Sequence, residues 1–172
     1  SCQKLDSLAS SVDIVPTILD AAGIDYTNMP LDGVSWLPML TGKTHSVRDD
    51  AYLEITYTRG VVTDKWKYIA VRFPAQLSNE IGTQTHLVNQ EGLRVTHDAL
   101  YGEMRSRYNA HELHPGYFDS DQLYNLKLDP AEQTNLATDQ EYAKVLKDMK
   151  ARLREYVSEL PHDFGEFKLS NN

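Results

Sequence analysis

The sequence has a single cysteine, Cys2, among its 172 residues. One thiol can form neither an internal disulfide nor a cysteine-based zinc cluster. Basic residues are also scarce, because 17 Lys and Arg face 25 Asp and Glu and the formal net charge is −8. That balance, without a basic cluster interleaved with aromatics, disfavours a nucleic-acid partner. No run approaches the roughly 20 apolar residues of a membrane span, and the N-terminal residues lack the pattern of a signal peptide. We therefore expect no nucleic-acid partner and no membrane partner.

The composition that remains is that of a globular domain with a core, with 41% hydrophobic and 24% charged residues. Helical spacing predicts a first helix over Val12–Ala22, capped by Ser10 or Ser11 and ended by Gly23. Asp13 is expected to be a first-turn residue without a chemical role. A short second helix is predicted over Trp36–Leu40, with Ser35 as its cap.

From Ala51 the apolar period changes to two, which is typical of strands. The predicted strands are Ala51–Thr56, Gly60–Thr63, Trp66–Arg72 and Leu123–Leu126. A turn at Asp64 and Lys65 would join the second and third strands in a hairpin.

The C-terminal part of the sequence predicts one long amphipathic helix over Tyr142–Leu160, opened by the capping pattern Thr138–Glu141 and followed by Pro161. Its apolar residues recur in steps of three and four, which makes one stripe: Tyr142, Val145, Leu146, Met149, Leu153, Tyr156, Val157 and Leu160. Upstream, Asp129 is expected to cap a turn to which Glu132 reaches back. The predicted fold class is α+β, with an antiparallel sheet of about four strands packed against the C-terminal helix.

Four segments, in one order along the chain, resemble the type I, formylglycine-dependent sulfatases of the alkaline-phosphatase-like superfamily. Ser11–Ile24 is similar to the family's "vDl-PTlldlaGi" helix, and Leu31–Gly42 to its "dG-Sl-pll-G" segment. Arg59–Ile69 is similar to the "R-vrt-dwKyi" hairpin, and Leu123–Leu136 to "LYnL-DP-E--NLa". The resemblance is to the C-terminal portion of these enzymes.

The resemblance implies two parts of a longer protein. Residues 1–48 would be the tail end of the large catalytic α/β domain with a connecting loop, and residues 49–172 the C-terminal sulfatase subdomain with a polar insert at about 73–120. The implied partner is the N-terminal catalytic domain. Cut off from that domain, the piece would expose apolar surface around Ile14, Ile18 and Trp36, so a homo-oligomer is also expected.

The implied activity is hydrolysis of sulfate esters, of a sulfated carbohydrate or an aryl sulfate, in the periplasm or outside the cell. The mostly polar insert favours the carbohydrate, since polar and aromatic side chains suit hydroxyl-rich ligands. The family makes its formylglycine from the first residue of a C/S-x-P/A-x-R motif and holds calcium beside it with Asp and Asn side chains. Cys2 does not fit this motif, because Lys4 and Asp6 stand where Pro or Ala and Arg are required. We therefore assign no catalytic residue and no metal ligand in this chain. Both groups are expected in the N-terminal part of the parent, and this piece alone is expected to be inactive.

Candidate substrate-binding residues lie in the polar insert: Arg105, Arg107, His111 and His114. Arginine forks suit oxyanions, so these side chains are expected to bind sulfate or sugar hydroxyl groups in the intact enzyme. A solvated loop is the plainer interpretation. The sequence His111-Glu112-Leu113-His114 is one residue short of the zinc motif H-E-x-x-H, and Asp119–Asp121 lacks the spacing of a calcium loop, which favours turn and capping roles.

Two other functions stay open at this point. The chain could be a non-catalytic binding or interaction module, or its parent could be a phosphatase or phosphodiesterase of the same superfamily. The deciding nucleophile is not among these residues.

Overall fold

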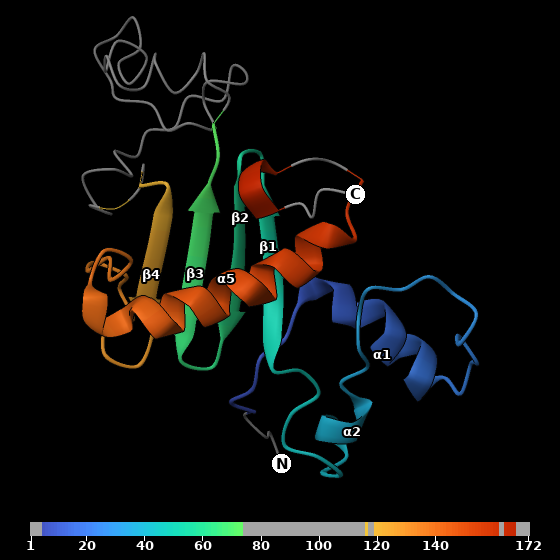
Figure 1. Ribbon diagram of the computed structural model, residues 1–172. Coiled ribbons are helices and arrows are strands. Elements are labelled where there is room, and N and C mark those ends of the chain that lie inside the picture. The colour runs from blue at the N-terminus through green and yellow to red at the C-terminus, as the bar shows by residue number, and fades with distance from the viewer. Residues whose placement is uncertain (1–4, 74–115, 117–118, 162–163, 168–172) are drawn as a thin grey trace, which may run out of the picture. The chain divides into compact units, whose positions relative to one another are not determined.

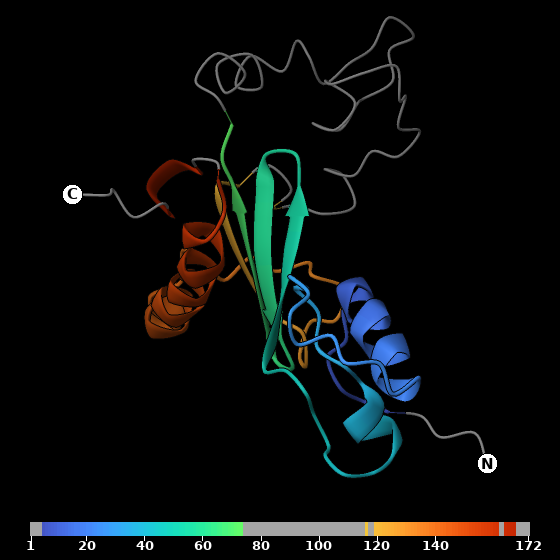
Figure 2. The same cartoon turned by 90° about the vertical axis from the view of Figure 1, so that its right-hand side faces the viewer.

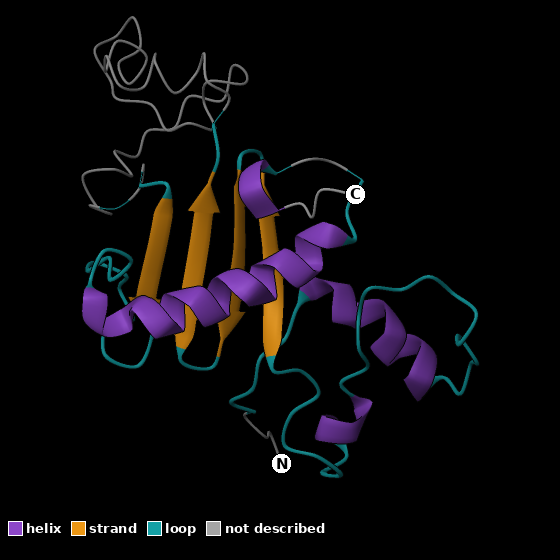
Figure 3. Ribbon diagram, in the orientation of Figure 1, coloured by secondary structure: helices purple, strands orange, loops and turns teal. Residues whose placement is uncertain are grey.

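The computed structural model describes residues 5–73, 116, 119–161 and 164–167. The chain divides into two compact units, residues 1–51 with 62–64, and residues 52–61 with 65–172. Figures 1 and 3 show the order and type of the elements. The expected boundary at residues 48 and 49 concerns domains of a longer protein, so it stays a prediction. No described helix combines the length and the apolar composition that crossing a membrane requires.

A four-stranded antiparallel sheet forms in the order β1-β2-β3-β4. Its strands are β1 (Asp50–Ile55), β2 (Thr58–Thr63), β3 (Trp66–Val71) and β4 (Asp121–Asn125). In the register of β3 against β4, Tyr68 lies opposite Leu123 and Lys67 opposite Tyr124. Because side chains alternate between the two faces of a sheet, these two pairs point to opposite faces. The predicted strands are confirmed, and their ends differ by one or two residues.

The long C-terminal helix covers one face of this sheet (Figure 2). It starts with the 3-10 turn η4 (Gln140–Tyr142) and continues as α5 (Ala143–Ser158). Asp139 caps the start, because its Oδ1 accepts the backbone N–H of Glu141 at 2.9 Å. The predicted helix is thus confirmed, but its cap is Asp139 and not Thr138, the first residue of the predicted capping box.

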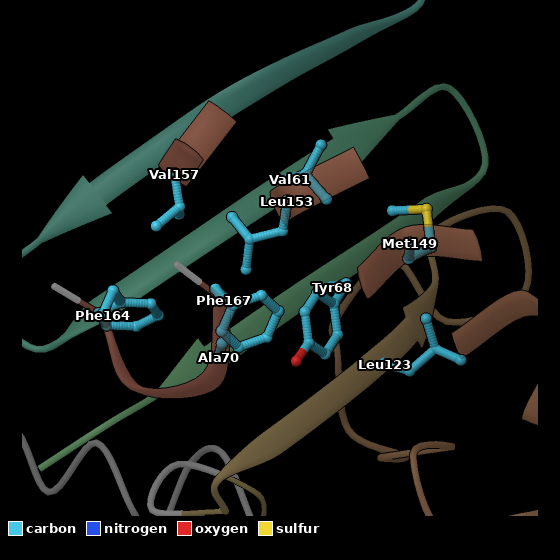
Figure 4. Close-up of a cluster of buried hydrophobic side chains, with 9 residues drawn as sticks. All are labelled: Val61, Tyr68, Ala70, Leu123, Met149, Leu153, Val157, Phe164 and Phe167. Atoms are coloured by element: carbon cyan, nitrogen blue, oxygen red, sulfur yellow. The ribbon is translucent and has the colours of Figure 1, made fainter. Parts of the chain in front are cut away.

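The apolar core lies between α5 and the sheet, and a short 3-10 turn near the C-terminus, η5 (Gly165–Phe167), closes one side of it (Figure 4). The strands contribute Val61, Tyr68, Ala70 and Leu123, α5 contributes Met149, Leu153 and Val157, and the C-terminal residues Phe164 and Phe167 complete the cluster. None of these nine is more than 6% exposed. The predicted stripe on the helix therefore faces the sheet as expected.

The turn after β4 differs from its prediction in one respect. Asp129 is a capping residue as expected, since its Oδ2 accepts the backbone N–H of Thr134 at 2.8 Å. Glu132, however, does not reach back into its own turn. Both of its carboxylate oxygens lie 2.8 Å from Lys67 Nζ on β3. Its backbone is left-handed, with φ of 57°, and this conformation turns the side chain toward the sheet.

Three short helices belong to the first unit: η1 (Ser11–Asp13), α1 (Ile14–Ala21) and α2 (Leu37–Leu40). The predicted C-terminal glycine is confirmed, because Gly23 has φ of 69°, a conformation that favours glycine. The cap of the second helix is confirmed too, since Ser35 Oγ accepts the N–H of Leu37 at 3.1 Å. Gly33 is required by close packing and not by a turn, because a Cβ there would lie 2.0 Å from the carbonyl oxygen of Val12.

Asp13 is more than the first-turn residue that the sequence predicted. It is completely buried, and its carboxylate accepts the N–H groups of Ser10 at 2.8 Å and Val34 at 2.9 Å. The indole N–H of Trp36 donates to it at 2.9 Å, and Arg48 Nη2 forms an ion pair with it. The prediction failed because these partners are up to 35 residues away in the sequence, where no local pattern points to them.

Candidate functional site

The ends of β3 and β4 lie side by side at the two ends of the predicted polar insert. The backbone N–H of Val71 donates to the carbonyl of Ser120 at 3.0 Å, and Ala70 lies opposite Asp121 in the register. We call residues 70–73 and 119–121 the stem. The stem is therefore the part of the described structure that adjoins the predicted insert in the sequence.

A group of charged and hydroxyl side chains gathers at the stem, and we call it the stem cluster: Tyr68, Arg72, Asp121, Lys150 and Glu166. Asp121 is its centre. Its Oδ1 accepts the hydroxyl of Tyr68 at 2.6 Å and Nη2 of Arg72 at 2.8 Å. Lys150 of α5 forms an ion pair with its other oxygen. Every member therefore has a partner inside the cluster.

The electrostatics of the cluster favour ionised carboxylates and a protonated tyrosine near neutral pH. Burial alone would raise the pKa of Asp121, but the hydrogen bonds from Arg72, Lys150 and Tyr68 outweigh it, so the pKa lies below its ordinary value. Burial and then the hydrogen bond to Asp121 raise the pKa of the Tyr68 phenol. The guanidinium of Arg72 lowers the pKa of Glu166, against the opposing effect of burial. The cluster thus holds two carboxylates, two cations and one protonated phenol.

A second network supports the stem from the other face of the sheet. The side-chain amide of Asn135 donates to Asp119 Oδ2 at 2.8 Å and to the carbonyl of Asp121 at 3.0 Å, while its Oδ1 accepts the N–H of Leu123 at 2.9 Å. The hydroxyl of Tyr124 donates to Gln122 Oε1 at 3.1 Å. Burial, followed by nearby carboxylates, raises the pKa of Tyr124 to about 12. This tyrosine is protonated at any physiological pH and acts as a fixed hydrogen-bond donor.

Gly116 completes this second network. A Cβ at this position would lie 2.8 Å from the Tyr124 hydroxyl and 3.2 Å from Asp119 Oδ2. Since 2.8 Å is closer than real Cβ contacts, the tyrosine occupies the space that a larger residue would need. The backbone can therefore pack closely against Tyr124 of β4 at this position because residue 116 has no Cβ.

This arrangement is suited to holding backbone in place rather than to bond breaking. Near neutral pH its carboxylates are ionised and hydrogen-bonded and its tyrosines are protonated, so the cluster offers no free nucleophile and no base with a pKa near 7. Within the described ranges, no three His, Cys, Asp or Glu side chains form a group that could hold a metal ion.

The four predicted binding residues, Arg105, Arg107, His111 and His114, lie outside the described residues, as does Cys2. The structure brings together another set instead. The turn or capping role predicted for Asp121 is wrong, because it is the first residue of β4 and the centre of the stem cluster. One signal in the sequence could have found it, since Arg72 and Asp121 are charged residues that flank the polar insert on both sides.

The two curated relatives and the solved structure described next are all sulfatases by name. No family model matches the chain. It is 29% identical over 154 residues to an ulvan-active sulfatase of Formosa agariphila, an alignment that covers 84% of this chain and 28% of the relative. It is 28% identical over 141 residues to human N-acetylglucosamine-6-sulfatase, covering 78% of this chain and 24% of the relative. The solved structure of a 2-O GAG sulfatase superposes with a TM-score of 0.56 at 22% identity, over 91% of this chain and 26% of that one.

The chain is similar to sulfatases over most of its length, and these matches support a C-terminal portion of such an enzyme. It spans about a quarter of the length of the curated relatives it matches. The resemblance and the fold class predicted from the sequence are therefore confirmed.

Proposed function

We propose that this chain is the C-terminal subdomain of a sulfatase that hydrolyses the sulfate esters of a sulfated glycan. The observation that carries the proposal is the similarity to an ulvan-active sulfatase over most of the chain. The second relative is likewise a sulfatase of a saccharide unit, N-acetylglucosamine. Both names concern sulfated sugars, which favours a carbohydrate ester over an aryl sulfate.

In this proposal the chain positions substrate-binding groups and does not itself cleave the ester. The stem cluster and the Asn135 network hold the two ends of the predicted insert. Arg105, Arg107, His111 and His114 would then bind sulfate or sugar hydroxyl groups, because guanidinium and imidazole groups donate hydrogen bonds to oxyanions.

The reactive groups of the proposed enzyme would lie elsewhere in the longer protein. A formylglycine hydrate supplies the nucleophile in such an enzyme, and calcium stabilises charge on the sulfate oxygens. The described residues include no group of three His, Cys, Asp or Glu side chains that could hold a metal ion, and the sequence around Cys2 lacks the formylglycine motif. The proposed compartment is the periplasm or the cell exterior.

Sulfate release by the full-length protein tests this proposal. We expect inorganic sulfate from ulvan or glycosaminoglycan oligosaccharides, and little from 4-nitrophenyl sulfate or the matching phosphate ester. The variant Arg105→Ala should raise KM for the sulfated sugar while the aryl sulfate is cleaved as before. Preferred cleavage of the phosphate ester, or no sulfate from any sugar, would contradict the proposal.

We further propose that apolar side chains of the first unit pack against the remainder of the longer protein. The side chains of Ile14, Val15 and Ile18 are 45%, 51% and 62% exposed. Without that partner, exposed apolar residues in one helix favour self-association. Light scattering should show the isolated 172-residue chain as a dimer or larger, and Ile18→Lys should shift it toward monomer. A monomer at high concentration would argue against the proposed contact surface.

A further inference from the structure

The last described residues of the chain return to the core after α5 has ended. Phe167 is completely buried and Phe164 is 6% exposed. The ring of Phe167 lies 6.2 Å from that of Tyr68, centroid to centroid, and Figure 4 shows Phe167 between Tyr68 and Phe164. We call residues 164–167 the strap. Its two aromatic anchors fix it on the face of the sheet that α5 covers.

The strap presents one carboxylate, Glu166, to the stem. Its Oε2 lies 2.9 Å from Nε of Arg72 and its Oε1 lies 2.5 Å from Nη2, so the pair is a two-point fork. The guanidinium also lies 5.2 Å from the centroid of the Phe167 ring. Gly165 lies between Phe164 and Glu166 with a φ of 54°, a left-handed backbone conformation that favours glycine.

The same guanidinium binds the opposite side of the stem. Nη1 of Arg72 donates to the carbonyl of Ser120, and Nη2 donates to Asp121 Oδ1 at 2.8 Å. One side chain therefore joins three stretches of chain. Ser120 is 48 residues from Arg72 in the sequence, and Glu166 is 94 residues away.

We propose that the strap holds the stem closed: through Glu166 it fixes the orientation of Arg72, and Arg72 in turn holds the two sides of the stem together. An arginine loses less freedom per hydrogen bond when its planar fork is already oriented. With Glu166 in place, the guanidinium is held where it meets Ser120 and Asp121. The docking of the strap on the sheet and the pairing of the two sides of the stem therefore stabilise each other. This inference does not depend on the proposed activity.

The coupling predicts a local effect because the anchors do not depend on Glu166. The side chain of Glu166 is 56% exposed, so Glu166→Gln removes a charge without opening a cavity. Phe164, Phe167 and the Asp121 contacts remain. The stem should consequently open more often, while the rest of the sheet keeps its stability.

Two backbone N–H groups in the 172-residue chain measure this difference by hydrogen exchange. The N–H of Val71 donates across the stem to Ser120 at 3.0 Å, and the N–H of Leu126 donates to Lys65 at 2.8 Å at the other end of the β3–β4 pair. In Glu166→Gln, exchange at Val71 should accelerate by about 5- to 10-fold, as expected for loss of a charge-assisted hydrogen bond that closes a local unit. Exchange at Leu126 should change by less than about 2-fold.

Glu132→Gln is the matched control, because it also removes one carboxylate from an ion pair with β3, in this case with Lys67. It should leave exchange at Val71 unchanged. Arg72→Lys keeps the positive charge but loses the fork, so it should accelerate Val71 at least as much as Glu166→Gln does. An unchanged Val71 in Glu166→Gln would overturn the proposal. Equal acceleration at Val71 and Leu126 would overturn it too, because the strap would then contribute only to global stability.

Discussion

The two units of the chain are stabilised in opposite ways. In the second unit the buried residues are mainly apolar, with Tyr68, Leu123 and Leu153 at 0% exposure. In the first unit Asp13 is at 0% exposure, and its carboxylate accepts several hydrogen bonds. The apolar side chain of Ile18 on α1, by contrast, is 62% exposed. The second unit thus has an extended apolar core, and the first unit has a buried carboxylate with several hydrogen-bond partners.

This difference teaches which unit can be stable by itself. Burial of apolar area is the main favourable contribution to folding, and the second unit has it in one cluster. The first unit buries fewer apolar side chains, and the hydrogen bonds to its buried carboxylate each contribute only modestly to net stability. We therefore expect the second unit to be the more independent of the two, and the variants below separate them. The indole signals of Trp36 and Trp66 in NMR spectra report on the first and second units respectively.

The largest effect is expected for Asp13→Ala. It leaves Arg48, whose side chain is 11% exposed, without its carboxylate, and it removes the acceptor for Val34, Trp36 and Ser10. Loss of one partner of a buried ion pair costs about 3–5 kcal/mol. In a urea titration the unfolding midpoint reported by the Trp36 signal should fall to a much lower urea concentration than in the unchanged chain. The midpoint reported by the Trp66 signal should stay the same. Equal shifts of both signals would show that the units unfold together.

Leu153→Ala is the corresponding variant of the second unit. Leu153 is completely buried between α5 and the sheet, and truncating a buried leucine costs about 2–5 kcal/mol. The Trp66 midpoint should fall accordingly. Leu128→Ala is a suitable control, because Leu128 is 80% exposed and its truncation should leave the midpoint nearly unchanged. A small effect of Leu153→Ala would mean that the core relaxes around the missing side chain.

Acid should weaken both units, through a different aspartate in each. The pKa of Asp13 lies below its ordinary value, because backbone and side-chain hydrogen bonds outweigh the effect of burial, and the pKa of Asp121 is lowered by its partners in the same way. A carboxylate with a lower pKa in the folded state stabilises that state above its unfolded pKa of about 3.9, and the contribution is lost as the pH falls through the folded value.

The free energy of unfolding should therefore decrease as the pH falls below about 4. Asp121→Asn should flatten this decrease for the Trp66 signal but not for the Trp36 signal, and urea midpoints at several pH values measure both. The same slope in Asp121→Asn and in the unchanged chain would show that other carboxylates control the acid limb.

The fold was predictable from the sequence wherever the cause is local. Period-two and helical patterns located the four strands and α5 because burial of one face imposes a spacing on neighbouring residues. Gly23, Ser35 and Asp139 were predictable as end residues, since each acts on groups only a few positions away. The apolar stripe of α5 also indicated which face meets the sheet.

The candidate site was predictable only in part, because its contacts are long-range. Arg72 meets Ser120 and Glu166 across 48 and 94 residues, and no spacing rule connects such positions. Asp13 was misjudged for the same reason, since its acidic side chain at a helix start already had a sufficient local explanation. The predicted binding residues between 105 and 114 remain predictions.

The smallest expected effect concerns Glu132, where two local terms oppose each other. Its left-handed φ of 57° is unfavourable for a residue with a Cβ, yet its carboxylate binds Lys67 at 2.8 Å. Both side chains are about a quarter exposed, at 25% and 23%, so the ion pair contributes at most about 1 kcal/mol. Glu132→Gln should lower the free energy of unfolding by about that amount, measured at the Trp66 signal.

Glu132→Gly loses the same ion pair but adopts the left-handed backbone without strain. It should therefore lie within about 0.5 kcal/mol of the unchanged chain, and above Glu132→Gln. If the glycine variant were the less stable of the two, the ion pair with Lys67 would not be the interaction that offsets the backbone strain at Glu132. The advantage of glutamate in the turn after β4 would then have another cause. Either the glycine variant has greater freedom in its unfolded chain, or the methylene groups of the glutamate contribute through contacts with the sheet.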